Sequence, residues 1–182
     1  GLVLSNKADA YRLERARAAD IATATISHRD FQDRASFDLA MDRLLREAGC
    51  ELLCLAGFMR ILSDGFVDIW RGRSINIHPS LLPAYRGLNT HARALADGAS
   101  HHGCSVHFVT EELDGGPVIA QAEVSIASDD TPESLAEKVQ AKEHILYPIV
   151  VRWFCEGRIQ LGSDYVLFDG EPLNAPMRLP DN

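Results

Sequence analysis

The sequence has no apolar run near the length of about 18 residues that crosses a bilayer. It also has no run of lysine or arginine residues, and its formal net charge is −8. Proteins that bind nucleic acid normally present a basic stripe to the phosphates, so neither a nucleic-acid nor a membrane partner is expected. Low-complexity tracts and internal repeats are absent as well. With 182 residues, 46% of them apolar, the chain fits one compact domain.

The four cysteines lie at positions 50, 54, 104 and 155 and form no Cys-x-x-Cys pair. Cys54 and Cys155 have apolar neighbours and are expected to be buried as small hydrophobes in a reduced, cytoplasmic setting. One further group contains metal-ligand types: His101, His102, Cys104 and His107. It lacks the paired spacing of a structural zinc site, and Cys104 and His107 would point to opposite faces of a strand. We therefore expect no metal site.

Hydrophobic periodicity and capping residues predict an α/β fold. Strands are expected at 2–5, 21–26, 52–56, 74–78, 105–109 and 118–126, and helices at 9–19, 36–48, 63–70, 90–96 and 131–156. A hairpin and a polar tail follow from about residue 158. The alternation of strand and helix in the first half predicts a mainly parallel sheet flanked by helices, which becomes mixed in the second half. Ligands sit beyond the carboxyl ends of strands in such sheets, so the loops after Ala56, His78 and Val109 are expected at one edge.

Two of these loops contain polar residues that suit catalysis. Asn76 and His78 are two residues apart on a strand, so their side chains project from one face. They could donate hydrogen bonds to one oxygen atom, although a buried polar pair before a proline turn is the alternative. In the loop 110–117, Glu111 and Glu112 are expected to be solvated, whereas Asp114 is better placed to point inward.

The set Asn76, His78 and Asp114 resembles the pattern of the formyltetrahydrofolate-dependent transferases. Three blocks in the family's order carry the resemblance: 56–62, 76–83 and 105–117. It covers the chain from Ser5 to about Gly170 and is most similar to the branch that acts on glycinamide ribonucleotide. The resemblance implies a Rossmann-like α/β fold and transfer of a formyl group from 10-formyltetrahydrofolate, as co-substrate, to the amine of glycinamide ribonucleotide in de novo purine biosynthesis. It further implies a cytoplasmic monomer or homodimer that needs no metal.

The resemblance also assigns roles to individual residues. Asn76 and His78 would donate hydrogen bonds to the formyl oxygen, and Asp114 would hold His78 and favour its charged form. The residues implied to bind folate are Arg34, Met59, Arg60, Ile61 and Leu62, and those implied to bind the sugar-phosphate substrate are Gln140 and Glu143. Without the resemblance, Leu62 reads equally well as a core residue, and Gln140 and Glu143 read as a solvated helix face. His107 is expected to have a structural role.

The N-terminus departs from the family pattern. Family members begin with a strand and a glycine- and serine-rich loop that binds the substrate phosphate, and nothing here matches that loop. Residue 1 corresponds to the second strand, so we expect residues 1–182 to be one formyltransferase domain that lacks a first βα unit of roughly 30 residues. Two alternative functions stay open for such a chain: formyltetrahydrofolate hydrolase and a non-catalytic folate-binding remnant. A sugar-nucleotide formyltransferase is a weaker third.

Overall fold

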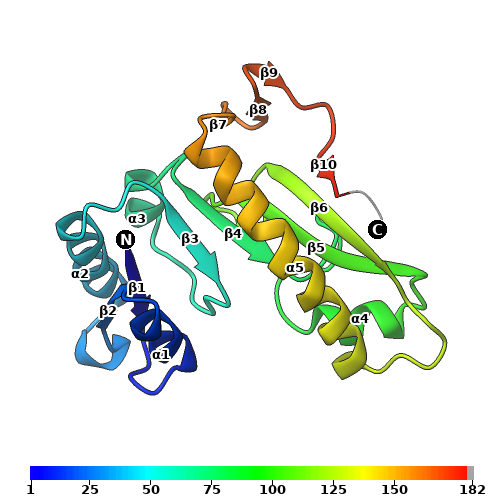
Figure 1. Ribbon diagram of the computed structural model, residues 1–182, viewed down its shortest axis with the longest axis horizontal. Helices are drawn as coiled ribbons and strands as arrows, with labels where there is room; N and C mark the ends of the chain where they lie inside the picture. The colour runs from blue at the N-terminus through cyan, green and yellow to red at the C-terminus, as the bar shows by residue number, and fades with distance from the viewer. Residues whose placement is uncertain (180–182) are drawn as a thin grey trace. The chain divides into compact units, whose positions relative to one another are not determined.

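The computed structural model describes residues 1–179 and falls into two compact units (Figure 1). The first unit comprises Gly1–Leu53 and Arg60–Trp70, and the second comprises Cys54–Met59 and the described residues from Arg71 onward. The last three residues of the expected polar tail, 180–182, lie outside the described part.

The first unit contains a small parallel sheet and helices that pack their apolar faces inward. Its elements are β1 (Leu2–Ser5), α1 (Tyr11–Ala18), β2 (Ala22–Thr25), the 3-10 helix η1 (His28–Asp30), α2 (Arg34–Glu47) and α3 (Asp64–Ile69). β1 and β2 pair in parallel, with Leu2 opposite Ala22. The α2 helix begins earlier than expected because the carboxylate of Asp33 caps it, accepting the N–H of Ser36 at 2.8 Å.

Two buried carboxylates of α2 anchor the segment that leads into and through α3. Asp38 accepts the backbone N–H of Ser63 at 2.6 Å, and Asp42 accepts the indole N–H of Trp70 at 3.0 Å. Asp42 also accepts the Nε–H of Arg46 at 2.9 Å. A buried carboxylate is stable only when such donors surround it, so these bonds fix the segment 60–70 on α2.

The second unit is built on a five-stranded mixed sheet in the order β10-β6-β5-β4-β3. Its elements are β3 (Leu53–Ala56, whose first residue belongs to the first unit), β4 (Ser74–His78), α4 (Thr90–Ala96), β5 (His101–Phe108), β6 (Val118–Ser125), α5 (Pro132–Cys155), β7 (Ile159–Leu161), β8 (Val166–Phe168), β9 (Glu171–Pro172) and β10 (Met177–Arg178). β4 pairs with β5 and β5 with β6 in antiparallel fashion, whereas β10 pairs with β6 in parallel. The expectation of an α/β fold with a mixed second half is confirmed. Strands β7, β8 and β9 form a separate three-stranded sheet.

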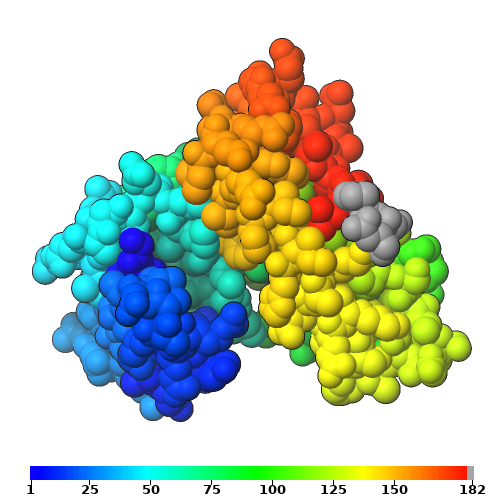
Figure 2. Space-filling model, viewed as in Figure 1, coloured from blue at the N-terminus to red at the C-terminus, as the bar shows by residue number. Residues whose placement is uncertain are grey.

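The long helix α5 covers one face of this sheet (Figure 1). It begins with Thr131 as its N-cap and a proline in its first turn, as the Thr-Pro start predicts, and it contains Pro148. Thr131 and Ser134 also form a capping box. Its core-facing residues are Leu135, Val139, Leu146 and Val150. The hydroxyl of Tyr147 lies 2.8 Å from the carbonyl oxygen of Leu55 and 3.0 Å from that of Ile75, which ties the helix to β3 and β4. The outer side of α5 is exposed (Figure 2).

Two expectations were wrong. Cys54 and Cys155 are exposed, because Cys54 alternates with the buried Leu53 and Leu55 along β3 and Cys155 ends α5. The loop after Val109 does not leave β5 at the same edge as the loop after His78, because β5 runs antiparallel to β4. The N–H of Val109 bonds to the carbonyl of Ser74, at the opposite end of β4 from His78.

Candidate active site

Asn76 and His78 project from one face of β4, as their spacing predicts. The alternating residues Ile75 and Ile77 are buried on the other face. In the antiparallel register Asn76 lies opposite His107 and His78 lies opposite Ser105, and directly opposed residues share a face. The strand pair thus brings an amide and two imidazoles together on one side of the sheet.

Both ring nitrogens of His78 face oxygen atoms that carry no proton. Nδ1 lies 3.4 Å from Oδ2 of Asp114, and Nε2 lies 3.0 Å from the carbonyl oxygen of Tyr85. A ring that donates to both must carry two protons, so these partners suit an imidazolium. His78 is 5% exposed, so its contact with Asp114 is shielded from water.

Asp114 reaches His78 because its loop folds back over the sheet. The N–H of Phe108 bonds to the carbonyl of Pro117 at 3.0 Å, which closes the loop 109–117 at its base. Asp114 has a left-handed backbone with φ of 49°, and Oδ2 accepts the N–H of Gly87 at 2.9 Å. An ion pair between Arg86 and Glu112 also joins this loop to the one after His78. The loop with Asp114 therefore does not start at the expected edge of the sheet, but its carboxylate still lies beside His78, on the strand that also carries Asn76.

His107 is the site residue that sequence reasoning assigned only a structural role. Its Nε2 lies 3.1 Å from Nδ2 of Asn76 and 3.8 Å from Oδ1 of Asp114, while Nδ1 lies 2.9 Å from the carbonyl oxygen of Phe108. Burial lowers the pKa of His107. The available signal was the two-residue spacing from Ser105, which places both side chains on one face of the strand. That this is the face of Asn76 and His78 follows only from the strand register.

A buried hydrogen-bond network around Ser105 fixes the loop that follows His78. Its hydroxyl donates to the carbonyl of Ser80 at 2.7 Å and accepts the N–H of Leu82 at 3.0 Å. The amide of Gln121 lies 2.9 Å from both this hydroxyl and the carbonyl oxygen of Leu82. The peptide between Leu82 and Pro83 is cis. The loop base is therefore anchored on β5 and β6.

The five residues implied to bind folate fall in both units. In the first unit, Arg34 is exposed at the start of α2, and the guanidinium carbon of Arg60 lies 5.4 Å from the ring centroid of Phe37, one turn further along α2. Ile61 is largely exposed, whereas Leu62 is 8% exposed and packs in the core. Met59 is 74% exposed and belongs to the second unit.

Gln140 and Glu143 lie on α5. Gln140 is exposed. Glu143 lies on the helix face that contains the buried residues Val139 and Leu146, and it is half-buried there. Burial raises the pKa of the Glu143 carboxyl.

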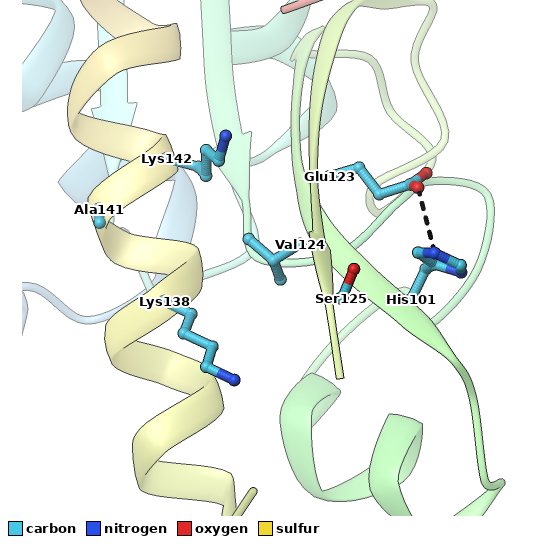
Figure 3. A pocket seen from close by; sticks show the side chains of 7 residues that line it. All are labelled: His101, Glu123, Val124, Ser125, Lys138, Ala141 and Lys142. Atoms are coloured by element: carbon cyan, nitrogen blue, oxygen red, sulfur yellow. Dashed lines mark ion pairs between the residues drawn. The ribbon is translucent and has the colours of Figure 1, made fainter. Parts of the chain in front are cut away.

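A shallow pocket lies elsewhere in the second unit, between α5 and the ends of β5 and β6 (Figure 3). It is lined by His101, Glu123, Val124, Ser125, Lys138, Ala141 and Lys142. The imidazole of His101 faces the carboxylate of Glu123 at 3.8 Å. Within residues 1–179, no group of three or more histidine, cysteine or acidic residues is arranged to hold a metal ion. In the same described part of the chain, no helix has the length and apolarity to cross a membrane.

The site and its α/β frame define a class of enzyme. The family model described as formyl transferase matches residues 1–151, and the chain belongs to this family of formyltransferases. It is 48% identical to phosphoribosylglycinamide formyltransferase from Escherichia coli (strain K12) over 171 residues, which are 94% of this chain and 81% of that protein. It is also 44% identical to the human trifunctional purine biosynthetic protein adenosine-3 over 90% of this chain and 16% of that protein.

A solved structure supports the same relationship. The phosphoribosylglycinamide formyltransferase from Coxiella burnetii superposes with a TM-score of 0.94 at 50% identity, covering 98% of this chain and 85% of that one. The similarity therefore includes both the fold and the overall sequence along nearly the whole chain.

Proposed function

We propose that this chain transfers a formyl group from 10-formyltetrahydrofolate to the amine of glycinamide ribonucleotide in de novo purine biosynthesis. The observation that carries the proposal is the 3.4 Å contact between His78 and Asp114, beside Asn76 on the same strand face. The Escherichia coli and Coxiella burnetii relatives, of which this chain covers 81% and 85%, are both named phosphoribosylglycinamide formyltransferase, after this acceptor.

The proposed chemistry needs donors at the formyl oxygen. As the amine attacks the formyl carbon, negative charge develops on that oxygen, and Asn76 and His78 would each donate one N–H to it. Preorganised donors of this kind each contribute roughly 10²–10³ in rate. For His78 to donate to the formyl oxygen, either Nε2 must give up its hydrogen bond to the carbonyl of Tyr85, or the Nδ1 proton must be shared between Asp114 and the formyl oxygen. The Nδ1 contact is the longer of the two.

Asp114 would stabilise the charged form of His78 and position the water that carries a proton from the attacking amine to the departing folate nitrogen. It is suited to both tasks because its carboxylate is only 10% exposed and its two oxygens have different surroundings. Oδ2 is held by Gly87 and faces His78, whereas Oδ1 lies 3.8 Å from His107.

The folate ring would bind against the segment 59–62, with Arg34 contacting the co-substrate from the start of α2. Exposed Met59 and Ile61 offer apolar surface to a flat ring, and the Arg60 guanidinium already lies over an aromatic face. Because the Leu62 side chain is buried, its contribution would come from the backbone.

Gln140 and Glu143 would contact the sugar-phosphate substrate from α5. We further propose that the chain acts as a single formyltransferase domain, as a monomer or homodimer in the cytoplasm. Size-exclusion chromatography with light scattering distinguishes the monomer from the homodimer.

One assay tests the function. The chain is incubated with 10-formyltetrahydrofolate, with and without glycinamide ribonucleotide, and formylated product and free tetrahydrofolate are measured. Formyl transfer only in the presence of the ribonucleotide supports the proposal. Release of formate without it indicates a hydrolase, and folate binding without turnover indicates a non-catalytic protein; either result overturns the proposal.

The variant His78→Ala tests the assigned catalytic group. We expect it to lower kcat by roughly 10²–10³ because one donor and its charge are lost, while the Kd for the folate changes little. Unchanged turnover in this variant would refute the role of His78.

A further inference from the structure

The protonation of His107 is set by the atoms around its ring. Nδ1 lies 2.9 Å from the carbonyl oxygen of Phe108. A carbonyl oxygen carries no proton, so the bond exists only if Nδ1 donates. When the ring is neutral, its single proton is therefore on Nδ1, and Nε2 presents a lone pair.

The surroundings of His107 favour the neutral ring. Its side chain is 3% exposed, and burial is the largest influence that lowers its pKa. The Phe108 carbonyl and Asp114 oppose this effect, whereas His78 and Arg86 add to it. The net result is a pKa below the usual value for histidine, which keeps the lone pair on Nε2.

The lone pair selects one of the two orientations of the Asn76 amide. The atom 3.1 Å from Nε2 is Nδ2 of Asn76. Only the NH2 end of the amide can donate to a lone pair, and turning the amide would place two acceptors in contact. One hydrogen of Nδ2 then points at His107 and the second is left for a ligand.

We propose that neutral His107 is a positioning residue that holds the amide of Asn76 with its N–H end, and not its carbonyl oxygen, toward the formyl oxygen of the co-substrate. The inference rests on the proposed function, because it assigns Asn76 an oxyanion as its target. His107 itself touches no reacting atom in this scheme. It acts by excluding the amide orientation in which an oxygen would face the developing negative charge.

The alternative state of the ring would undo this arrangement. An imidazolium would donate from Nε2, either to Oδ1 of a turned Asn76 or to Oδ1 of Asp114, which lies 3.8 Å away. The first outcome presents the amide oxygen to the substrate, and the second diverts Asp114 from His78. The protonation state of His107 thus affects Asn76, Asp114 and, through Asp114, His78.

The first test reads the tautomer directly in the whole, substrate-free protein. Nitrogen-15 NMR of the histidine rings at neutral pH, with His107→Gln used to assign the signals, distinguishes a protonated from an unprotonated ring nitrogen. We expect a protonated Nδ1 and an unprotonated Nε2. A protonated Nε2, alone or together with Nδ1, overturns the inference whether or not the enzyme transfers formyl groups.

The second test uses a matched pair of variants. His107→Leu removes the acceptor, and we expect kcat to fall by about tenfold to a hundredfold while the KM for the folate changes less than about threefold. His107→Gln offers a side-chain oxygen at a similar reach, and we expect it to recover most of the lost kcat. Equal loss in both variants, or a loss confined to KM, contradicts a positioning role.

The two tests separate this inference from the proposed function. If the wild-type chain does not formylate glycinamide ribonucleotide, the function fails while the NMR result still stands. If wild-type transfer is observed and His107→Leu keeps full kcat, only the inference fails. A thermal unfolding curve for each variant shows whether a change in kcat comes from a loss of folded protein.

Discussion

Asp114 accepts the backbone N–H of Gly87 at 2.9 Å, and this hydrogen bond joins the two loops that form the site. The same oxygen, Oδ2, lies 3.4 Å from Nδ1 of His78. One carboxylate therefore has a structural and an electrostatic task, and the two can be separated by substitution.

Asp114→Asn keeps an oxygen for Gly87 but removes the negative charge beside His78. We expect kcat to fall by about a hundredfold or more, because the imidazolium loses its counter-charge, while the melting temperature stays close to that of the wild type. Glu111→Gln, an exposed carboxylate of the same loop, is the control and should keep its activity. Steady-state kinetics with thermal unfolding checks both. Comparable activity of Asp114→Asn and Glu111→Gln would show that the charge at Asp114 has no catalytic role.

Gly116 lies so close to the carbonyl of Phe108 that a β-carbon would overlap the oxygen atom. Gly116→Ala must therefore displace the backbone of the loop that carries Asp114, and we expect a loss of about 2–4 kcal/mol in stability together with most of the activity. At the neighbouring Gly115, the three atoms nearest to an added β-carbon belong to the side chain of Glu112, which is exposed and can move at the expense of its ion pair with Arg86. Gly115→Ala should thus cost about 1 kcal/mol or less. Denaturant unfolding of both variants tests the difference, and equal losses would contradict it.

The sequence was sufficient to predict the strands and helices that carry the site, because their apolar periodicity and caps are local properties. The two-residue spacing of Asn76 and His78 on β4 also fixes their common face without knowledge of the fold. The start of α2 was placed two residues late because the cap is Asp33, whose bond to Ser36 precedes the apolar pattern. Such errors concern element ends and leave the site unchanged.

The remainder depended on tertiary structure. Periodicity does not reveal that β5 runs antiparallel to β4, and therefore that the loop with Asp114 must fold back over the sheet to reach His78. The contact between His107 and Asn76 could not be predicted for the same reason, since it follows from strand register. Register is set by packing and by turn geometry, which a single sequence specifies only weakly.

Ser105→Ala tests the network that anchors the loop after His78. The substitution removes the hydroxyl that accepts the N–H of Leu82 and donates to the carbonyl of Ser80, and it leaves these two groups only their mutual bond at 3.2 Å. A buried polar group that is left without a partner costs about 1–3 kcal/mol, and the weakened bonding here is expected to cost an amount toward the lower end of this range. We expect a loss of stability in this range and a smaller fall in kcat as His78 loses its support. Ser105→Thr keeps the hydroxyl and serves as the comparison. If Ser105→Ala unfolded at the same denaturant concentration as the wild type, the hydrogen-bond network around Ser105 would not contribute to stability.

A buried histidine pair predicts how stability depends on pH. Nε2 of His102 lies 3.2 Å from Nδ1 of His91, and His102 is 1% exposed. Burial, together with the nearby His91 and His78, lowers the pKa of His102 from 6.5 to about 4. Between these two pH values the unfolded chain binds a proton at this ring and the folded chain does not. Stability is therefore complete above about pH 6.5 and is lost as the pH falls toward 4, by about 3 kcal/mol for this residue.

The variant His102→Gln removes the titrating ring, so its unfolding free energy should fall less steeply between pH 7 and pH 5 than that of the wild type. Some slope will remain, because burial also lowers the pKa values of His91 and His107. His101→Gln is the matched control: this neighbouring histidine is exposed, and its substitution should leave the pH dependence almost as it is in the wild type. Urea unfolding at a series of pH values provides the measurement. If His102→Gln and the wild type lose stability in parallel over this range, His102 is not the group whose protonation destabilises the fold in acid.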